Sequence, residues 1–407
     1  MKMILSLAWR NLWRNKRRSL ITISSVLFAV LLAIIFYSLE QGSYNRMIDS
    51  MVRYSTGYLQ IQDIYYEEEP SIDNSLLFDE QVEDVLQSHA DHIAYYVPRI
   101  QSFALAATDA QTRGALVTGI DPERESLMND LHDDLVDGSF LEKGDKDILI
   151  AEGLAGILKL GTGDSLILLG QGFQGTTAAG HYRIRGIVDL KVPEMNNNAI
   201  YLSLGQAQWF FGTGERLTSL IIMPHNPRHT EQLAAAIGAD LDPEWYQVLT
   251  WKQMLRDLLA LMQFDIAGTM VMIMILYVVI TFGLFGTILT MMLERRREFG
   301  VLLSLGMKRS RLALVCFTES VLFTLTGVVA GMGVSLPILL YFYHNPIRLT
   351  GDMAETMIEY GFEPVMPFSL DPVVFLTQAR IVLVISLLVG LYPVYKIFRM
   401  RVIDAKQ

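Results

Sequence analysis

Long apolar runs alternate with polar stretches along the chain, and four of the runs are long enough to cross a bilayer. About 20 helical residues, at roughly 1.5 Å each, span the hydrocarbon core of a membrane. We therefore predict four transmembrane helices, and they cover approximately residues 19–39, 266–293, 312–343 and 373–395.

Basic residues flank each apolar run on one side and predict its orientation. By the positive-inside rule, segments 1–18, 294–311 and 396–407 face the cytoplasm, whereas segments 40–265 and 344–372 face outward. All four flanks agree with this topology, which leaves both termini cytoplasmic. The first run is too long for a signal peptide and no small-residue cleavage site follows it, so we interpret it as an uncleaved anchor.

The segment before the first apolar run has its own pattern. Within residues 1–18, apolar side chains alternate with basic ones, as in a helix that lies in the membrane interface. A plain positively charged flank is the alternative. The apolar positions of this predicted amphipathic helix are Leu5, Trp9, Leu12 and Trp13.

Segment 40–265 has mixed periodicity and no run of membrane length. Period-two patterns predict strands at 57–62, 115–120, 165–169, 181–188, 199–202 and 217–223. Helical patterns occur at 80–88, 152–160, 204–211, 230–237 and 250–263. Because strands and helices interleave, the fold class we predict is an α-helical membrane protein whose large α+β extracytoplasmic domain is inserted between helices one and two. The loop 344–372 would be the second outward segment.

Composition and charge exclude several classes of protein. With 51% hydrophobic and 19% charged residues, and a mean hydropathy of +0.32, the composition argues against a wholly soluble protein. Segment 40–265 holds 15 basic and 34 acidic residues, so nucleic acid is not an expected partner. The single cysteine, Cys316, rules out an intrachain disulfide.

The sequence offers no catalytic centre. It lacks the G-x-x-x-x-G-K-[ST] motif that would cradle the phosphates of ATP, so we predict that the chain is not an enzyme and binds no cofactor directly. His225 and His229 are four residues apart, but Pro224 and Pro227 prevent the regular helix that would place both on one face. We predict no catalytic residues and no metal site.

The most informative local pattern lies between the second and third apolar runs. Segment 294–311 is short and charged, carries an apolar stripe at Phe299, Leu302, Leu303 and Leu305, and has a helix-ending glycine at Gly306. A basic loop that only sets topology needs neither feature. The pattern therefore indicates a helix on the cytoplasmic surface that docks a partner.

Inside the apolar runs we expect three kinds of functional position. Glu319 and Arg380 are the ionisable residues there, and such residues are functional candidates by default. Their axial offset of about 12 Å argues against a direct pair. Arg380 reaches the outer interface in one interpretation, and we place Glu319 in a hydrogen bond at the base of the bundle near the docking helix.

Small and flexible apolar residues supply the other two kinds. The spacing of Gly327, Gly331 and Gly333 permits close helix packing, either within one subunit or at a dimer seam. A substrate-lining surface on the first two helices is the last candidate, with ordinary lipid-facing residues as the alternative. Its residues are Phe28, Met270, Met274 and Phe282.

These residues bring out a family resemblance. The sequence E-R-R-R-E-F-G-V-L-L-S-L-G-M at 294–307 resembles the coupling-helix signature of the FtsX/MacB/LolC-LolE superfamily of ABC transporter permeases. Looser similarity extends along nearly the whole chain, at 8–19, 147–164 and 201–208, at Glu319, and at Tyr392-Pro393. The arrangement is most similar to the lipoprotein-releasing type, and no ATPase domain is fused.

The resemblance implies how the chain works. It would be a permease subunit in a bacterial inner membrane that pairs with a second copy or a sister permease and docks a cytoplasmic ABC ATPase dimer, which holds ATP and Mg²⁺. Coupling to the ATPase is implied for Glu294, Arg295, Arg296, Arg297, Glu298, Phe299, Gly300, Leu303, Leu305, Gly306 and Met307.

Mechanotransmission would carry ATP-driven closure to the outer domain, which would act on a lipoprotein or another lipid-anchored or periplasmic substrate. An adaptor or chaperone in the periplasm is a further implied partner. Two alternatives stay open: MacB-like efflux of amphiphiles or peptides through an adaptor and outer-membrane channel, and FtsX-like regulation of a cell-wall hydrolase.

Overall fold

The computed structural model describes residues 10, 16–129, 131–359 and 364–399. The amphipathic helix predicted over 1–18 lies almost wholly outside these residues, as does most of the tail 396–407. The chain divides into two compact units, which we call the helical unit (the described parts of Met1–Asn45, Leu261–Arg348 and Val365–Gln407) and the inserted unit (Arg46–Ala260 and Leu349–Pro364).

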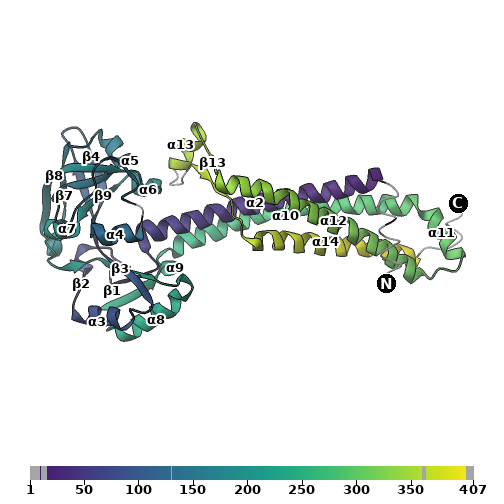
Figure 1. Ribbon diagram of the computed structural model, residues 1–407, viewed down its shortest axis with the longest axis horizontal. Coiled ribbons are helices and arrows are strands. Elements are labelled where there is room, and N and C mark those ends of the chain that lie inside the picture. Colours follow the sequence, from purple (N-terminus) through teal and green to yellow (C-terminus); the bar gives the residue numbers. More distant parts are fainter. Residues whose placement is uncertain (1–9, 11–15, 130, 360–363, 400–407) are drawn as a thin grey trace. The chain divides into compact units, whose positions relative to one another are not determined.

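Four helices of the described chain are long and apolar enough to cross a membrane. They are α2 (Lys16–Met51), α10 (Arg256–Glu294), α12 (Arg309–His344) and α14 (Pro372–Arg399), and the short helix α11 (Arg296–Ser304) connects α10 to α12 (Figure 1). All four are longer than the apolar runs that predicted them, and two of them by ten residues or more at one end: α2 continues past residue 39 to Met51, and α10 begins before residue 266, at Arg256. Polar residues therefore extend both helices at the end that connects to the inserted unit in the sequence.

Aliphatic side chains from all four long helices form the core of the helical unit. The core includes Val26, Val30 and Ile34 of α2, Ile280 and Leu284 of α10, Val328 of α12, and Val382 and Val389 of α14. Side-chain hydrogen bonds add specificity, because Ser386 Oγ donates to Thr324 Oγ1 over 2.6 Å and the Tyr277 hydroxyl donates to Gln378. Both bonds are made by α14, which thereby ties α12 and α10 together.

The inserted unit is built on one ten-stranded mixed sheet. Nine strands follow the order β12-β1-β11-β3-β4-β9-β6-β8-β5, and β7 pairs with β3 and β8. The pairs β4–β9 and β6–β8 are parallel, and the other pairs are antiparallel. The strands are β1 (Leu59–Asp63), β3 (Ile93–Ala107), β4 (Thr112–Ile120), β5 (Leu135–Gly138), β6 (Ile148–Ala151), β7 (Ser165–Gln171), β8 (Thr177–Val188), β9 (Ala199–Ser203), β11 (Ser219–Pro224) and β12 (Tyr246–Thr250).

Two sets of helices cover different halves of this sheet. Helices α3 (Glu80–Ser88) and α8 (Thr230–Asp240) pack on the half that contains β1 and β11. Helices α5 (Glu152–Leu158) and α7 (Leu204–Phe211) pack on the half that contains β4, β6, β8 and β9. Strand β3 contributes to the core of the second half and pairs with β11 of the first, so it joins the two halves.

Shorter elements complete the chain. In the inserted unit they are α4 (Pro122–Met128), α6 (Pro193–Asn196), α9 (Trp251–Met254), the paired strands β2 (Leu76–Leu77) and β10 (Arg216–Leu217), the π-helical turn η1 (Val52–Thr56), and the 3₁₀ turns η2 (Ile72–Asn74), η3 (Phe173–Gly175) and η4 (Pro227–His229).

Segment 344–372 is not the simple loop we predicted. It contains helix α13 (Asp352–Glu359) and a strand pair, β13 (Ile347–Arg348) with β14 (Val365–Met366).

The first two membrane helices connect to neighbouring strands. Helix α2 runs through η1 into β1, and β12 leads through α9 into α10. Strands β1 and β12 pair antiparallel, with Leu59 opposite Thr250, and the Trp251 amide donates to the Tyr58 carbonyl over 3.0 Å. Both helices are therefore connected in sequence to the same strand pair.

Candidate functional site

The segment predicted to dock a partner forms a defined helix-turn. Helix α10 ends at Glu294, Arg295 precedes the first turn of α11, and α11 ends at Ser304. Gly306 follows with φ +93°, and the Met307 amide donates to the Leu302 carbonyl over 3.0 Å. This left-handed glycine closes the helix in the usual way and turns the chain into α12.

Arg295 anchors this helix to the membrane bundle. Its Nη1 donates to both carboxylate oxygens of Glu319, over 2.9 and 3.2 Å, and its Nε donates to Glu298 over 3.1 Å. Only 1% of the Glu319 side chain is exposed, and a charge buried to this extent is stable only with a partner. Glu319 therefore lies where we expected it, at the base of the bundle and next to the docking helix.

The apolar stripe of α11 divides between two environments. Phe299 is buried against Met292, Leu312, Cys316 and other residues of the chain's own bundle, with Leu302, Leu303 and Met307 at the edge of this cluster. Gly300 is also buried. Phe299 therefore packs within the chain and not on the exposed side of α11, and its role in coupling stays a prediction.

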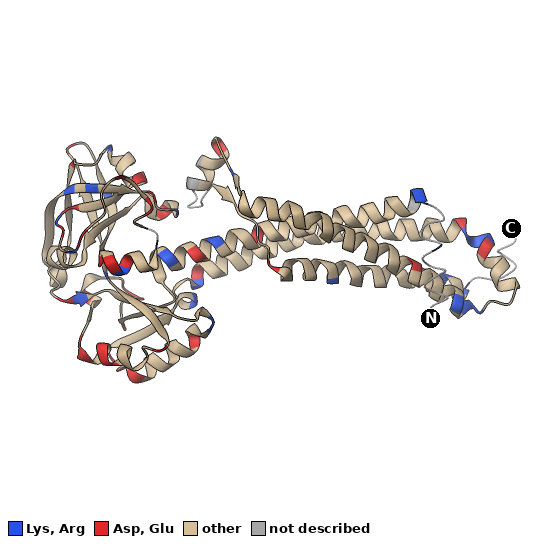
Figure 2. Cartoon of the chain, in the orientation of Figure 1, with Lys and Arg blue, Asp and Glu red and all other residues tan. Residues whose placement is uncertain are grey.

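A different set of residues of this segment faces outward. Leu305 is 79% exposed and Val301 is 58% exposed, and polar residues surround them. We define the docking face as the exposed residues Glu294, Arg296, Arg297, Glu298, Val301 and Leu305. Figure 2 shows that Lys and Arg positions of the ribbon gather at this end of the helical unit, close to α11.

The glycines of α12 have two roles. A Cβ on Gly327 would lie 2.6 Å from the Val26 Cβ, and one on Gly331 would lie 2.9 Å from the Val30 Cβ, so both glycines let α12 approach α2 of the same chain. A Cβ on Gly333 would meet nothing within 4 Å. Close packing within the chain therefore applies to the first two glycines, whereas Gly333 makes no close contact within the chain and its place at a dimer seam stays a prediction.

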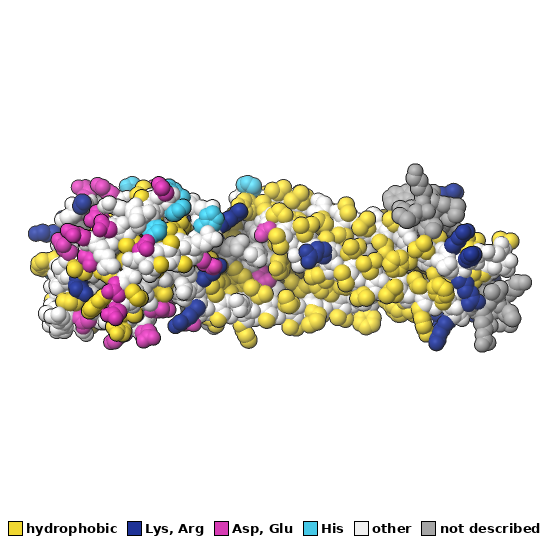
Figure 3. All heavy atoms as spheres, turned by 90° about the horizontal axis from the view of Figure 1, so that it is seen from below, with side chains coloured by type: hydrophobic (Ala, Val, Ile, Leu, Met, Phe, Trp, Pro, Cys, Tyr) yellow, Lys and Arg dark blue, Asp and Glu magenta, His cyan; other side chains and the backbone are white. Residues whose placement is uncertain are grey.

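The four predicted lining residues are on the surface of the helical unit. Phe28 of α2 and Met270, Met274 and Phe282 of α10 are each more than half exposed. The apolar stretch of α10 is only 22% buried, against 39–50% for those of the other three long helices. Hydrophobic side chains predominate on the face of the helical unit shown in Figure 3. Because α10 is the least buried of the four long helices, it presents the largest share of its apolar stretch at the surface.

Arg380 is exposed on α14. Glu319 pairs with Arg295 instead, in agreement with the axial offset between Glu319 and Arg380. No group of three or more His, Cys, Asp or Glu residues in the described part of the chain is arranged to hold a metal ion.

Four membrane-length helices, with a large mixed α/β domain inserted between the first and second, are the architecture of a polytopic membrane protein. Two family models match the chain: the MacB-like periplasmic core domain over residues 19–240, and the FtsX-like permease C-terminal domain over residues 270–402. The first alone covers more than half of the 407 residues. The chain belongs to the FtsX/MacB family of ABC transporter permeases, whose members are transmembrane components that work with a cytoplasmic ABC ATPase.

Two solved structures are among those similar to the chain. One is the extracellular domain of the noncanonic ABC-type transporter YknZ from Gram-positive bacteria, with 14% identity, coverage of 48% of this chain and 100% of that chain, and a TM-score of 0.34. The other is the periplasmic region of MacB from Actinobacillus actinomycetemcomitans, with 11% identity, coverage of 51% of this chain and 95% of that chain, and a TM-score of 0.35. No curated protein matches the chain.

Proposed function

We propose that this chain is the permease subunit of a transporter that moves a lipoprotein or another lipid-anchored or periplasmic substrate by mechanotransmission. A separate ATPase dimer docks on α11, and a second copy or a sister permease completes the membrane part. ATP-driven movement of α11 passes through the bundle to α2 and α10, and from them to the inserted unit.

The observation that carries this proposal is the double attachment of α11. Its outer side presents Val301 and Leu305 to a partner, and its inner side is tied to the bundle by the Arg295–Glu319 ion pair and by Phe299. A surface helix that is both exposed to a partner and anchored in a buried ion pair transmits a displacement rather than bending away from it.

The exposed apolar surface of α10 supports a substrate taken from the lipid phase. Inside the bundle, polar side chains of the described helices pair with each other, as in the hydrogen bonds Ser386–Thr324 and Tyr277–Gln378. Large flexible side chains such as Met270, Met274 and Phe282 are suited to acyl chains. By the positive-inside rule, the basic residues near α11 support the predicted topology, with α11 and both termini in the cytoplasm and the inserted unit in the periplasm.

The docking assignment is tested with a charge placed on the docking face. Leu305→Asp should abolish co-purification with the ATPase and reduce ATP-dependent release of a triacylated lipoprotein from proteoliposomes more than tenfold. The matched control is Leu77→Asp, at an exposed leucine of the inserted unit, which should behave as wild type. Normal ATPase binding and release by Leu305→Asp would refute the docking assignment.

The substrate class is tested by photo-crosslinking. A photoreactive residue at Phe282 should capture the acyl chains of the lipoprotein before ATP is added and lose them afterwards. The control position is Leu388, which is exposed on α14 and should capture only bulk lipid. Equal capture at both positions would refute a lipoprotein path along α10, and ATP-driven export of a free amphiphile would favour the efflux alternative.

A further inference from the structure

The outer end of the first membrane helix is held by side chains of the inserted unit. Helix α2 continues into η1, and the carbonyls at a helix C-terminus have no partner within the helix. Arg99 Nη1 donates to the carbonyls of Tyr54 and Ser55, over 3.0 and 2.9 Å, and Gln60 Nε2 donates to the Thr56 carbonyl over 2.8 Å. Three successive terminal carbonyls are thus capped by residues of β3 and β1.

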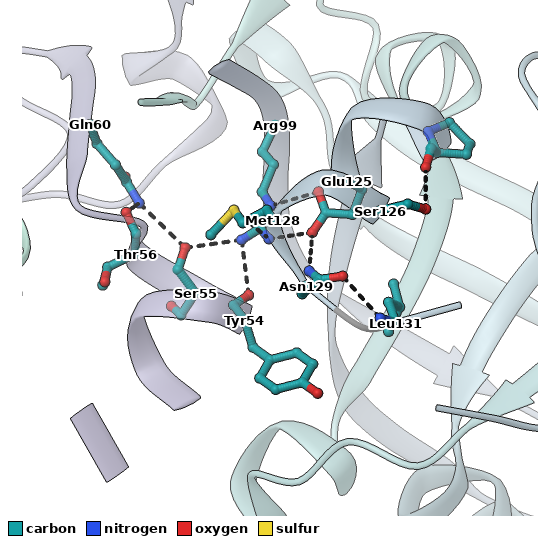
Figure 4. A network of polar contacts seen from close by, with 11 residues as sticks. Tyr54, Ser55, Thr56, Gln60, Arg99, Glu125, Ser126, Met128, Asn129 and Leu131 are labelled. Atoms are coloured by element: carbon teal, nitrogen blue, oxygen red, sulfur yellow. Dashed lines mark hydrogen bonds and ion pairs between the residues drawn. The ribbon is translucent and has the colours of Figure 1, made fainter. Parts of the chain in front are cut away.

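Arg99 is a buried cation with a fixed carboxylate partner. Its side chain is 3% exposed and that of Glu125 is 0% exposed. Arg99 Nε donates to Glu125 Oε2 over 3.1 Å, and Nη2 donates to Oε1 (Figure 4). Burial would lower the pKa of Arg99, but the Glu125 carboxylate outweighs it and the pKa is raised. The guanidinium therefore stays charged at the negative end of the helix dipole.

Further hydrogen bonds hold the Glu125 carboxylate and the end of the helix in place. Asn129 Nδ2 donates to Glu125 Oε1 over 2.6 Å, and the Asn129 Oδ1 accepts from the Leu131 amide over 3.1 Å. On the other side, the Tyr54 hydroxyl donates to Asp134 over 2.5 Å. The network in Figure 4 therefore joins η1, β3 and α4, and nearly all of its hydrogen-bond donors and acceptors have partners.

The position of Arg99 in the sheet explains why this network can bear a load. Arg99 lies in β3, where it is opposite Ser219 of β11 and Ile120 of β4. Strand β3 joins the two halves of the sheet. A displacement of the helix end that reaches Arg99 is thus passed to both halves, not to β1 alone.

We infer that Arg99, held by Glu125, is a positioning residue that clamps the outer end of the first membrane helix to the sheet, so that movement of the helix is passed to the whole inserted unit. The clamp gives the proposed mechanotransmission its rigid outer joint, and this step rests on that proposed function. Lysine cannot replace arginine here, because one ammonium group cannot donate to two carbonyls and both carboxylate oxygens at once.

The test uses the full chain with its ATPase in lipid nanodiscs, in a Cys316→Ser background. Spin labels at Asp49→Cys of α2 and Glu123→Cys of α4, both exposed positions, report the distance across the clamp. In the protein with native Arg99, the distance distribution should be narrow both with and without ATP. In the Arg99→Lys variant, the width of the distribution should at least double. Glu125→Gln, which keeps the shape of the side chain, should also broaden it.

Arg185→Lys is the matched control. Arg185 also donates to a main-chain carbonyl, that of Phe140, and pairs with Glu142 and Asp145, but it does not contact the helix end. This variant should leave the label distribution narrow. An unchanged width in both Arg99→Lys and Glu125→Gln would overturn the clamp.

A transport assay distinguishes failure of the clamp from failure of the proposed function. Arg99→Lys should reduce ATP-driven substrate release about tenfold while the rate of ATP hydrolysis stays within twofold of wild type. A broadened distribution with normal release would overturn the positioning role of Arg99. If the wild-type protein itself releases no substrate with ATP, the proposed function fails, whereas the distance measurement still decides whether the clamp exists.

Discussion

Replacing Gly327 with valine should open the contact between α12 and α2. A Cβ at this position would lie 2.6 Å from the Val26 Cβ and 3.0 Å from the Ile23 carbonyl oxygen. Neither atom can rotate away, because one is a main-chain oxygen and the other is fixed to the backbone of α2. The two helices must therefore separate to admit even the first carbon of the new side chain.

The cost follows from the packing. Inserting carbon atoms into a well-packed core costs about 1–3 kcal/mol, and valine recovers a few tenths of a kcal/mol because it favours helix more than glycine does. We expect a net loss of about 2 kcal/mol in the free energy of unfolding of the helical unit. For a unit of this size, that loss lowers the unfolding midpoint by about 4–8 °C.

The single cysteine provides the assay. Cys316 is buried in the cluster around Phe299 in the helical unit, 1% exposed, so a fluorogenic maleimide reacts with it only as the bundle opens on heating. The matched control is Gly333→Val, because a Cβ on Gly333 meets nothing within 4 Å, and its midpoint should stay within about 1 °C of wild type. Equal shifts in the two variants would refute the assignment of Gly327 to the α2 contact.

Two further predictions concern one site in each unit. Glu319→Gln removes the buried carboxylate that anchors Arg295 to α12, a loss of about 1.5–3 kcal/mol for charged hydrogen bonds, so amide hydrogen exchange in α11 should quicken by at least tenfold; unchanged exchange there would contradict the anchoring role. Gly57→Ala places a Cβ against Ile221 at a φ of +60° and should lower the melting temperature of the inserted unit more than Gly144→Ala, where φ is +83° but nothing lies within 4 Å. Equal melting temperatures in these two glycine variants would show that backbone conformation alone, not the Ile221 contact, sets the cost.

Elements with a clear period could be predicted from the sequence. The helices predicted at 80–88 and 204–211 have those bounds in the structure, as α3 and α7. Strand β3 was missed, although it is the longest, because Pro98, Arg99 and Gln101 break the apolar alternation. Those polar positions are tolerated because tertiary contacts satisfy them, which no local pattern reports.

The candidate site, like the fold, could be predicted from the sequence only where the signal is local. Local sequence indicated α11, its terminal glycine, and the place of Glu319 in the bundle. It did not reveal that Arg295 is the partner of Glu319, or that Arg99 pairs with Glu125, because these pairs join residues that are 24 and 26 positions apart. It also could not separate Gly327 from Gly333, since both lie on one helix and only the position of α2 distinguishes them.

Affinity purification of the chain from its native membranes, with the stoichiometry of every co-purifying protein, tests the central claim most directly. We predict an ABC ATPase dimer bound to two permease subunits, either two copies of this chain or one copy and a sister. Leu305→Asp should lose the ATPase and keep the second permease. Recovery of the wild-type chain without an ATPase, in a detergent that preserves a known ABC transporter complex, would contradict the account.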